Sequence, residues 1–405
     1  MIDLNTYIEQ NGNPDAVIDY NGNSGILAGI WGFDEILTCV NNKTYLNGKY
    51  IEGNPLDIFQ NTIKKWQNDS QIFSAIGFFS YDFKNIIYPH IPFKPIKNSN
   101  PQFWFGKPNK VEILPQLFII EPKVNSLLIN KSEGIEKSDY KLLIEKIKAN
   151  LENGNVYQIN QTYPINFDFE GDPFNLYSQL SWKIKPRRGM YLNTGKENIL
   201  SFSPEEFIRV KNRHIYSYPM KGTRPEGATE LERQQNIKEL ANSEKDRAEH
   251  LMIVDLLRND LGKICKFGSV KINNLYEIQT YETVHHMVTE VLGELKNSTE
   301  ISDIIQALFP GGSITGAPKE KAMSIIDNLE DYNRGIYTGA MGYIKPNGDM
   351  DFNISIRTLT IEKNNATYPV GGGIVWDSDS NEEWLETKAK SKILNFVQSK
   401  MESIC

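Results

Sequence analysis

Two strand-like runs joined by a turn signal constrain the fold of this chain more than any other feature. Residues 336–344 and 351–361 read as strands, and the Pro-Asn-Gly sequence at 346–348 between them is typical of a hairpin. A hairpin places its two strands antiparallel. Since helical stretches separate other strand-like runs, we expect an α+β fold with mixed or antiparallel sheets.

The remaining chain alternates between short strands and helices. Further strands are expected at 74–81, 117–120, 156–160 and 368–375. Helices are expected at 138–150, from 229 to about 261 with Gly262 as a stop signal, from about 318, and at 381–401. Residues 1–135 read mainly as short strands with turns, so the helices concentrate in the later part of the chain.

Composition excludes several classes of protein. The 405 residues carry a net charge of -7, which argues against nucleic acid as the main partner. No basic stretch followed by an apolar one opens the chain, and no apolar run approaches membrane-spanning length. The three cysteines, Cys39, Cys265 and Cys405, form neither a zinc spacing nor a disulfide framework. We therefore expect a cytoplasmic protein without a membrane segment.

Lys221 is the most informative single residue. It lies in the segment 218–225, which contains Gly222, Pro219 and Pro225, and we expect a turn there after a strand. A lysine on such a turn can point into a cleft, and partial burial makes its amine a usable nucleophile. An exposed loop lysine is the plainer alternative for this residue taken alone.

Two helices are expected to carry paired carboxylates. Asp246 and Glu249 are three residues apart, and so are Glu383 and Glu386, so each pair shares one helical face. Carboxylate oxygens are the ligands that Mg²⁺ prefers. Either pair alone also fits a solvated helix surface that carries ion pairs to neighbouring lysines.

Two glycine-rich segments are candidates for close contact with a ligand. Residues 309–319 lead into a helix, whose free N–H groups attract anions, although the segment lacks the Gly-Lys-Ser/Thr ending of a phosphate loop. The three glycines at 371–373 end a strand and leave its backbone accessible. For either segment taken alone, a tight turn is the plainer explanation.

A strand arginine and a histidine pair complete the candidates. Arg357 is expected to share a strand face with Asn353 and Ser355, where it binds a carboxylate or forms an edge ion pair. His285 and His286 are adjacent, so a strand points them to opposite faces. One of them is a candidate proton donor, and simple packing is the alternative.

From about residue 155 onward the chain resembles the chorismate-utilising enzymes. The matching blocks occur in family order and lie at 156–160, 203–205, 218–225, 245–260, 286–288, 309–319, 351–359 and 371–373 with its following helix. The resemblance implies two orthogonally packed, mainly antiparallel sheets flanked by helices. Residues 1–135 would be the N-terminal portion of that fold, and 136–405 the chorismate-binding catalytic region.

Two positions select a branch of that family. Gln158 stands where the isochorismate and salicylate branches carry a water-activating lysine, so the resemblance disfavours water as the nucleophile. Lys221 stands where the anthranilate branch usually has alanine. Lysine there resembles aminodeoxychorismate synthase component I, which makes 4-amino-4-deoxychorismate for 4-aminobenzoate and folate biosynthesis. Anthranilate synthase component I and a non-catalytic binding subunit are the alternatives.

The resemblance also implies roles for individual residues. Lys221 would attack the ring, Glu205 would act as general acid and then base, and His286 matches a family histidine whose role here is less defined. Mg²⁺ would be held by Asp246, Glu249, Glu383 and Glu386. Substrate contacts would come from Gln158, Thr223, Gly316, Ala317, Tyr337, Arg357, Gly372, Gly373 and Lys390. With no glutaminase motif in the chain, ammonia would come from a glutamine amidotransferase partner in a heterodimer.

Overall fold

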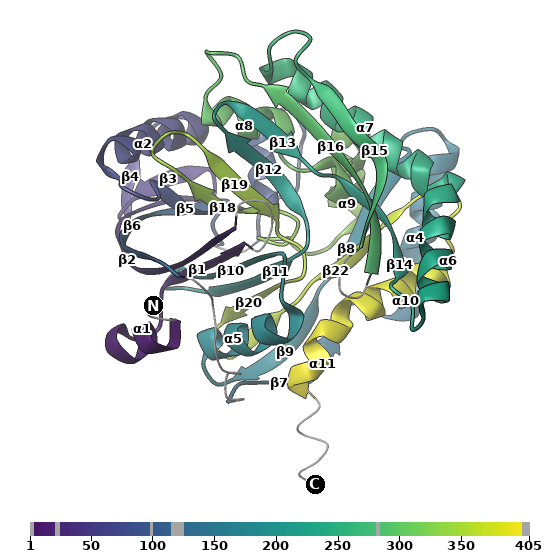
Figure 1. The fold of residues 1–405 in the computed structure, drawn as a ribbon, viewed down its shortest axis with the longest axis horizontal. Coiled ribbons are helices and arrows are strands. Elements are labelled where there is room, and N and C mark those ends of the chain that lie inside the picture. Colours follow the sequence, from purple (N-terminus) through teal and green to yellow (C-terminus); the bar gives the residue numbers. More distant parts are fainter. Residues whose placement is uncertain (1–3, 21–24, 98–99, 115–124, 281–283, 399–405) are drawn as a thin grey trace.

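The computed structural model describes residues 4–20, 25–97, 100–114, 125–280 and 284–398. Every pair of neighbouring strands among these residues is antiparallel. Helices cover the outside of the sheets (Figure 1). The prediction of an α+β fold built on antiparallel sheets is therefore confirmed.

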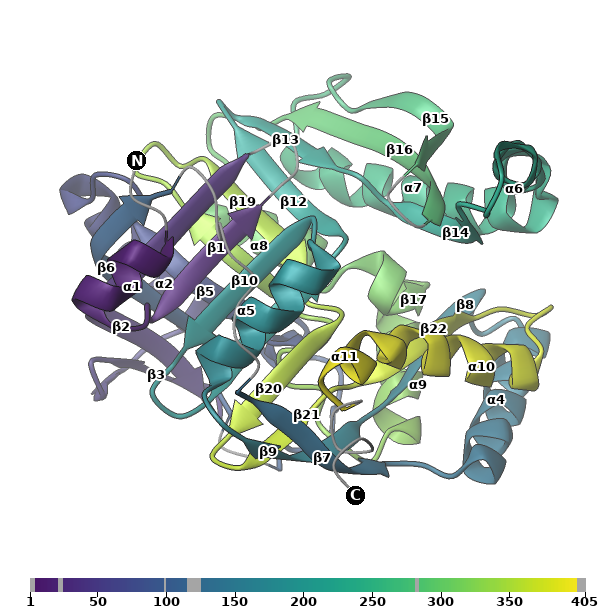
Figure 2. The same cartoon turned by 60° about the horizontal axis from the view of Figure 1, so that its bottom comes forward.

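Most strands belong to one hydrogen-bonded network that folds into two layers (Figures 1 and 2). In pairing order the first layer contains β7 (Leu127–Glu133), β9 (Ile165–Glu170), β21 (Asn365–Thr367), β20 (Thr358–Glu362), β11 (Asn198–Ser203), β10 (Arg188–Asn193) and β1 (Ala16–Tyr20). The long strands β2 (Ile26–Val40) and β6 (Phe103–Ile113) connect it to the second layer, and β3 (Lys43–Leu46) and β4 (Lys49–Ile51) extend the edge of β2.

The second layer carries the strand that holds Lys221. It contains β5 (Ala75–Phe79), β18 (Ala340–Ile344), β19 (Met350–Ile354), β12 (Glu206–Lys211), β13 (His214–Ser217) and β16 (Val284–Glu294), with β14 (Met220–Pro225) and β15 (Lys271–Thr280) both paired to β16. A separate three-stranded sheet contains β17 (Gly316–Ala317), β8 (Gln158–Tyr163) and β22 (Val370–Ile374).

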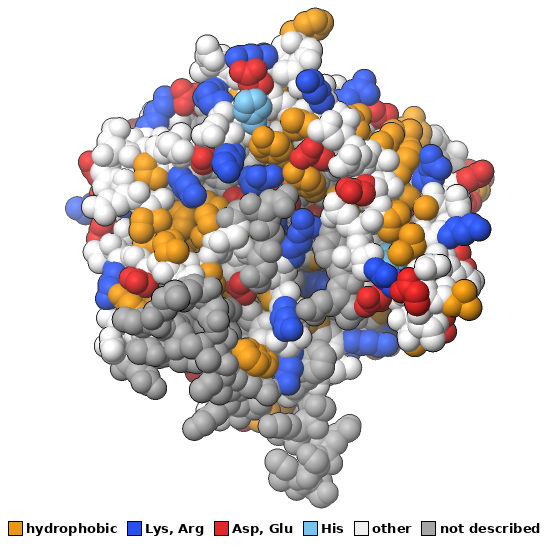
Figure 3. Space-filling view, viewed as in Figure 1, with side chains coloured by type: hydrophobic (Ala, Val, Ile, Leu, Met, Phe, Trp, Pro, Cys, Tyr) orange, Lys and Arg blue, Asp and Glu red, His pale blue; other side chains and the backbone are white. Residues whose placement is uncertain are grey.

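Helices pack on both sides of this framework. They are α1 (Leu4–Asn11), α2 (Pro55–Asp69), α3 (Lys84–Ile87), α4 (Lys137–Glu152), α5 (Pro173–Ile184), α6 (Glu230–Asn242), α7 (Glu244–Ile264), α8 (Ile301–Leu308), α9 (Lys319–Leu329), α10 (Ser380–Ser391) and α11 (Asn395–Gln398). No helix in the described ranges is long and apolar enough to cross a membrane. On the face seen in Figure 3, acidic and basic side chains are interspersed rather than gathered into one charged field.

A buried arginine joins the two layers. The guanidinium of Arg188 on β10 pairs with the carboxylates of Glu206 on β12 and Asp351 on β19, and all three side chains are at most 5% exposed. Asn353 donates its amide to the Arg188 carbonyl at 3.2 Å. Burial raises the pKa of Glu206 to about 7 against the opposing effect of Arg188, so this carboxylate depends on its cation.

Several sequence-based boundaries were wrong, for identifiable reasons. The helix expected from 229 to 261 is broken at Ser243, whose extended backbone and side-chain oxygen cap the start of α7 at Asp246 N–H, 3.2 Å away. Gly262 does not end α7, which continues to Ile264. The helix expected at 381–401 is divided, because α10 ends at Ser391 and is followed by a 3-10 helix (Lys392–Leu394) and by α11, and residues from 399 lie outside the described ranges.

Other corrections concern strands. The run 351–361 is two strands, because β19 ends at Ile354 and β20 begins at Thr358, with Arg357 at φ +50° between them. The expected hairpin at 346–348 does join β18 and β19, which pair from Ala340 with Ile354 onward. Residues 218–225 are not a turn alone, since Lys221 lies within β14. The strand expected at 117–120 lies outside the described residues.

Replacing Arg188 with Met should destabilise the protein by about 3–5 kcal/mol, because two carboxylates would stay buried without their cation. The free energy of unfolding from urea titration measures this loss. Arg258→Met is the matched control, since Arg258 and Asp255 form an ion pair at 3.2 Å whose side chains are both 57% exposed, and such pairs contribute about 0–1 kcal/mol. Equal losses in the two variants would contradict the role given to Arg188.

Candidate active site

The candidate site lies between two groups of elements that are far apart in the sequence. Helix α7 and strand β14 form one side, and the three-stranded sheet with α10 forms the other (Figure 2). The side chain of Lys221 on β14 crosses between them and donates to Gln158 Oε1 on β8 at 2.9 Å. The structure therefore brings together two of the residues that selected the family branch.

Lys221 is held by two oxygen acceptors. Besides Gln158, its Nζ lies 3.7 Å from Oε2 of Glu249 on α7. The side chain of Lys221 is 15% exposed and that of Glu249 is 18% exposed. The amine is therefore mostly buried and faces the interior of the site, as the nucleophile hypothesis requires.

The glycines of β22 allow charged side chains to approach the backbone. A Cβ atom at Gly373 would lie 3.1 Å from both Gln158 Nε2 and Lys221 Nζ. A Cβ atom at Gly372 would lie 3.1 Å from Glu383 Oε2. Side chains at these positions would crowd the polar groups, so the glycines allow those groups to lie close to the backbone of β22.

Three of the four predicted metal carboxylates are balanced by lysines. Burial raises the pKa of Glu249 and of Glu383, while nearby lysine ammonium groups oppose that shift. Glu386 pairs with Lys390 at 2.7 Å, and this ion pair outweighs burial and lowers the pKa of Glu386. Lys245, which sequence reasoning missed, acts electrostatically on all three carboxylates.

The fourth predicted ligand has a different partner. Asp246 Oδ2 accepts from the guanidinium of Arg224 at 3.0 Å, and Gly222 is the residue whose Cβ would come within 3.0 Å of Asp246 Oδ1. Across the described residues, no three His, Cys, Asp or Glu side chains are arranged as a metal site. The carboxyl oxygens of Glu249 and Glu383 are nevertheless the kind of donor that a hard divalent cation binds. Burial raises the pKa of both groups, and the positive charge of such a cation would favour their ionised forms.

Glu205 is poised for proton transfer. It lies just before β12, is 8% exposed, and accepts from Ser313 Oγ at 3.1 Å. Burial raises its pKa to about 7, and Lys221 and Lys390 act in the opposite direction. A carboxyl group with a pKa near neutrality can both give and take a proton at physiological pH.

The two adjacent histidines separate as predicted for a strand. His285 is fully buried and contacts Thr280 Oγ1 at 2.9 Å, whereas His286 Nδ1 lies 3.1 Å from the Gly222 carbonyl. Because a carbonyl only accepts, Nδ1 of His286 carries a proton. Burial lowers the pKa of His286, so its neutral form is favoured.

Arg357 does not share a strand face with Asn353 and Ser355, because it lies in the connection between β19 and β20. Its positive φ of +50° turns the chain there, and its carbonyl accepts from the Phe202 N–H at 3.0 Å. The Arg357 charge acts on the pKa of both His286 and Tyr368, so the side chain still lies toward this part of the molecule.

The remaining predicted substrate contacts lie in several places. Gly316 and Ala317 form β17 and pair with β8, where a Cβ atom on Gly316 would come within 2.0 Å of the Gln158 carbonyl. Thr223 is exposed beside His286 at 3.2 Å, and Lys390 donates to the Gly371 carbonyl at 2.7 Å. Tyr337 is 5% exposed and interacts with buried Arg334 rather than with Lys221.

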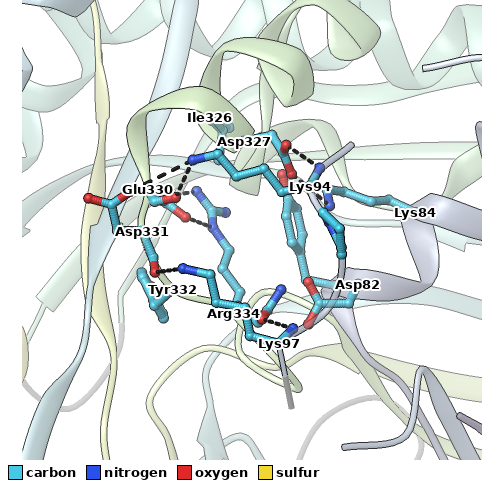
Figure 4. A pocket seen from close by; sticks show the side chains of 13 residues that line it. Asp82, Lys84, Lys94, Lys97, Ile326, Asp327, Glu330, Asp331, Tyr332 and Arg334 are labelled. Carbon is cyan, nitrogen blue, oxygen red and sulfur yellow. Dashed lines mark hydrogen bonds and ion pairs between the residues drawn. The ribbon is translucent and has the colours of Figure 1, made fainter. Parts of the chain in front are cut away.

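Buried Arg334 binds the backbone of β8 and of the segment that precedes β17. Its guanidinium pairs with Glu330 at 2.8 Å and donates to the carbonyls of Asn160 at 2.6 Å and Ile314 at 3.0 Å. It thereby ties β8 to the glycine-rich segment 309–319. Figure 4 shows Arg334 and Glu330 among the hydrogen bonds and ion pairs that line a small pocket, and none of the predicted site residues lines this pocket.

Sequence reasoning also missed residues that hold the predicted ones in place. Ser313 binds Glu205, Arg224 binds Asp246, and Ser378 Oγ donates to Glu383 Oε1 at 2.7 Å. Lys245 lies four residues before Glu249 on the same helix, so its spacing was a usable signal. The contact of Ser378 with Glu383 depends on the loop before α10 and left no pattern in the sequence.

Comparisons with known proteins find likeness in both sequence and fold. Residues 120–395 match the family described as chorismate binding enzyme. The chain is 40% identical over 263 residues to anthranilate synthase component 1 of Saccharolobus solfataricus, which is 65% of this chain and 62% of that protein. It is 40% identical over 267 residues to aminodeoxychorismate synthase component 1 of Salmonella typhimurium, which is 66% of this chain and 59% of that protein.

The chain thus spans less than two-thirds of the length of these relatives. Solved structures extend the likeness over nearly the whole fold. Anthranilate synthase component I from Streptococcus pneumoniae superposes with a TM-score of 0.79 at 26% identity, over 90% of this chain and 91% of that one. MenF, the menaquinone-specific isochorismate synthase of Escherichia coli, has a TM-score of 0.75 at 17% identity over 98% and 91%, which supports the fold alone.

Glu205→Gln should change how stability depends on pH. The raised pKa means that folded Glu205 keeps its proton to about pH 7, whereas the unfolded chain loses it near pH 4.5. Its favourable contribution is therefore complete below pH 4.5 and is lost as the pH rises to about 7. Relative to the variant, the wild-type free energy of unfolding should fall by up to about 3 kcal/mol across that interval.

Urea titrations at several pH values measure this difference. Glu145→Gln on α4 is the control, because Glu145 is exposed and should leave the pH dependence of the wild type unchanged. Parallel pH profiles for the wild type and the Glu205→Gln variant would contradict the raised pKa.

Proposed function

Because the chain belongs to the chorismate-binding enzyme family, we propose that it is the chorismate-aminating component of an aminodeoxychorismate synthase. It would convert chorismate and ammonia into 4-amino-4-deoxychorismate. The observation that carries this proposal is the placement of Lys221, whose amine is mostly buried and lies between Gln158 and Glu249. Relatives named aminodeoxychorismate synthase component 1, at 40% identity, are consistent with it.

The reaction would proceed by two displacements. The neutral amine of Lys221 attacks ring carbon C2, both conjugated ring double bonds shift toward C4, and the C4 hydroxyl leaves as water with a proton from Glu205. Ammonia then adds at C4, Glu205 takes a proton back, and the bond to Lys221 breaks as both double bonds return to their original positions. The pKa of about 7 of Glu205 suits a residue that must act first as acid and then as base.

The charges of the site fit a small dianionic substrate. Lys390 and Arg357 are the cations that would balance the two carboxylates of chorismate, and Gly372 and Gly373 keep side chains of β22 away from the polar groups of the site. Glu249, Glu383 and Glu386, with Asp246 nearby, would hold Mg²⁺. When bound, the ion would neutralise and position a substrate carboxylate.

Ammonia would come from a separate glutamine amidotransferase subunit. The relatives are named as component 1 of their enzymes, which is consistent with a second component. The folded chain itself places Lys221 near Gln158, which belongs to the amination branches rather than the water-activating ones. We therefore place ammonia, not water, as the second nucleophile.

Anthranilate synthase component I is the second candidate. Relatives with that name reach the same 40% identity, and His286 occupies the position that the family resemblance connects with pyruvate loss. The two functions differ in product: 4-amino-4-deoxychorismate keeps the enolpyruvyl group, whereas anthranilate forms with release of pyruvate. Mass spectrometry of the products from chorismate, ammonium and Mg²⁺ distinguishes them, and anthranilate as the main product would refute the first proposal.

Lys221→Ala should lower the rate of 4-amino-4-deoxychorismate formation by a factor of about 100 or more, because it removes the covalent route. The rate is measured by mass spectrometry with saturating ammonium and Mg²⁺. Lys211→Ala is the matched control, since Lys211 is exposed at the end of β12. If Lys221→Ala retained the wild-type rate, Lys221 would be a bystander.

Glu383→Gln should raise the Mg²⁺ concentration needed for half-maximal rate by about 10-fold or more, since one anionic oxygen ligand is lost. A Mg²⁺ titration of turnover after chelator treatment gives this value. The neighbouring Glu382→Gln is the control because Glu382 is exposed on the same helix turn. The same Mg²⁺ dependence in both variants would remove Glu383 from the metal site.

A further inference from the structure

The amide group of Gln158 is buried and only half satisfied. Gln158 is 0% exposed, and its Oε1 accepts from Lys221 Nζ at 2.9 Å. Its Nε2 has no hydrogen-bond partner among the described residues. Because a buried amide donor is costly to leave unpaired, this nitrogen indicates a place for an acceptor that the protein itself does not provide.

The orientation of the amide follows from its partner. A lysine ammonium only donates, so the amide oxygen must be the atom that binds Lys221, and the amide nitrogen is left to donate to another acceptor. The backbone of Gly373 adjoins both groups, because a Cβ atom built there would lie 3.1 Å from Gln158 Nε2 and 3.1 Å from Lys221 Nζ. A ligand oxygen that rests on Gly373 therefore meets the free donor beside the amine.

We propose that Gln158 is a two-sided positioning residue, which orients the Lys221 amine through Oε1 and anchors a substrate oxygen through Nε2. This inference rests on the proposed function and adds a role to it. The ligand it requires is a small ring carboxylic acid whose carboxylate or hydroxyl oxygen lies against Gly373. One rigid, planar amide thus fixes the distance between the nucleophile and the ring that it attacks.

The oxygen side of Gln158 acts more strongly during attack than before it. As the amine forms its bond to carbon, positive charge develops on Nζ while its two N–H groups remain. Oε1 continues to accept one of these N–H groups, and the attraction grows with the charge, so it stabilises the transition state more than the ground state. The neutral amide also avoids adding a further negative charge to a site that already contains Glu249 at 3.7 Å from Nζ.

The covalent step separates this role from simple binding. Without ammonia, wild-type protein incubated with chorismate and Mg²⁺ should accumulate a covalent adduct on Lys221. Rapid quenching and mass spectrometry of the peptide that contains Lys221 measure how fast this adduct forms. Gln158→Met should form that adduct about 100-fold more slowly, since small misplacements of a reacting group have effects of this size. Folding is checked by thermal unfolding of each variant.

Gln161→Met provides the matched control. Gln161 is also buried on β8, at 1% exposed, but three residues of strand place it on the opposite face, and its Nε2 donates to the Thr162 carbonyl at 3.0 Å. This variant should form the adduct at the wild-type rate. Equal slowing in the two variants would show that loss of a buried amide, not positioning of Lys221, is responsible, and would overturn the proposal.

The nitrogen side is tested where the lysine cannot contribute. In a Lys221→Ala background, Gln158→Met should weaken chorismate binding by about 2- to 10-fold in calorimetry, as expected for one lost hydrogen bond. Unchanged binding would overturn the anchoring role. Absence of any adduct in the wild type would refute the proposed function, whereas an adduct that forms equally fast in wild type and Gln158→Met would refute only this inference.

Discussion

The ion pairs of Arg188 hold together the part of the structure on which the site depends. They join β10 of the first layer to β12 and β19 of the second. Glu206 in this cluster directly follows Glu205, so the strand that directs Glu206 toward Arg188 leaves Glu205 to contact Ser313 on the glycine-rich segment. Of these two consecutive residues, Glu206 joins the layers through Arg188, and Glu205 is the one to which we assign proton transfer. Burial raises the pKa of each to about 7.

In the candidate site, the charges of lysines and carboxylates balance one another close to the glycines of β22. Lys221, Lys245 and Lys390 act on the acidic residues of α7 and α10, while glycines of β22 remove the side chains that would separate them. A divalent ion and a dianionic substrate would together change that balance very little, because they bring opposite charges of equal size. This explains how a protein with a net charge of -7 can be suited to an anionic substrate.

Much of this arrangement was accessible from local patterns. Spacing placed Asp246 with Glu249 and Glu383 with Glu386 on helices, and the Pro-Asn-Gly signal placed the hairpin of β18 and β19. The break at Ser243 is a local cap, in which Ser243 Oγ accepts from Asp246 N–H, so the sequence carried a usable signal there. Residue patterns failed at Arg357, where a left-handed residue separates β19 from β20. The pairing of Lys221 with Gln158 joins positions 63 residues apart, and only the family resemblance associated them beforehand.

The pairing of strands that are far apart in the sequence affects how this chain folds during synthesis. Strand β1 lies between β2 and β10, and β5 pairs with β18, so β5 is synthesised 261 to 269 residues before the residues with which it pairs. Closing such long loops costs entropy before any contact repays it. Until residues 340–344 leave the ribosome, one edge of β5, which carries the apolar residues Phe78 and Phe79, has no partner strand.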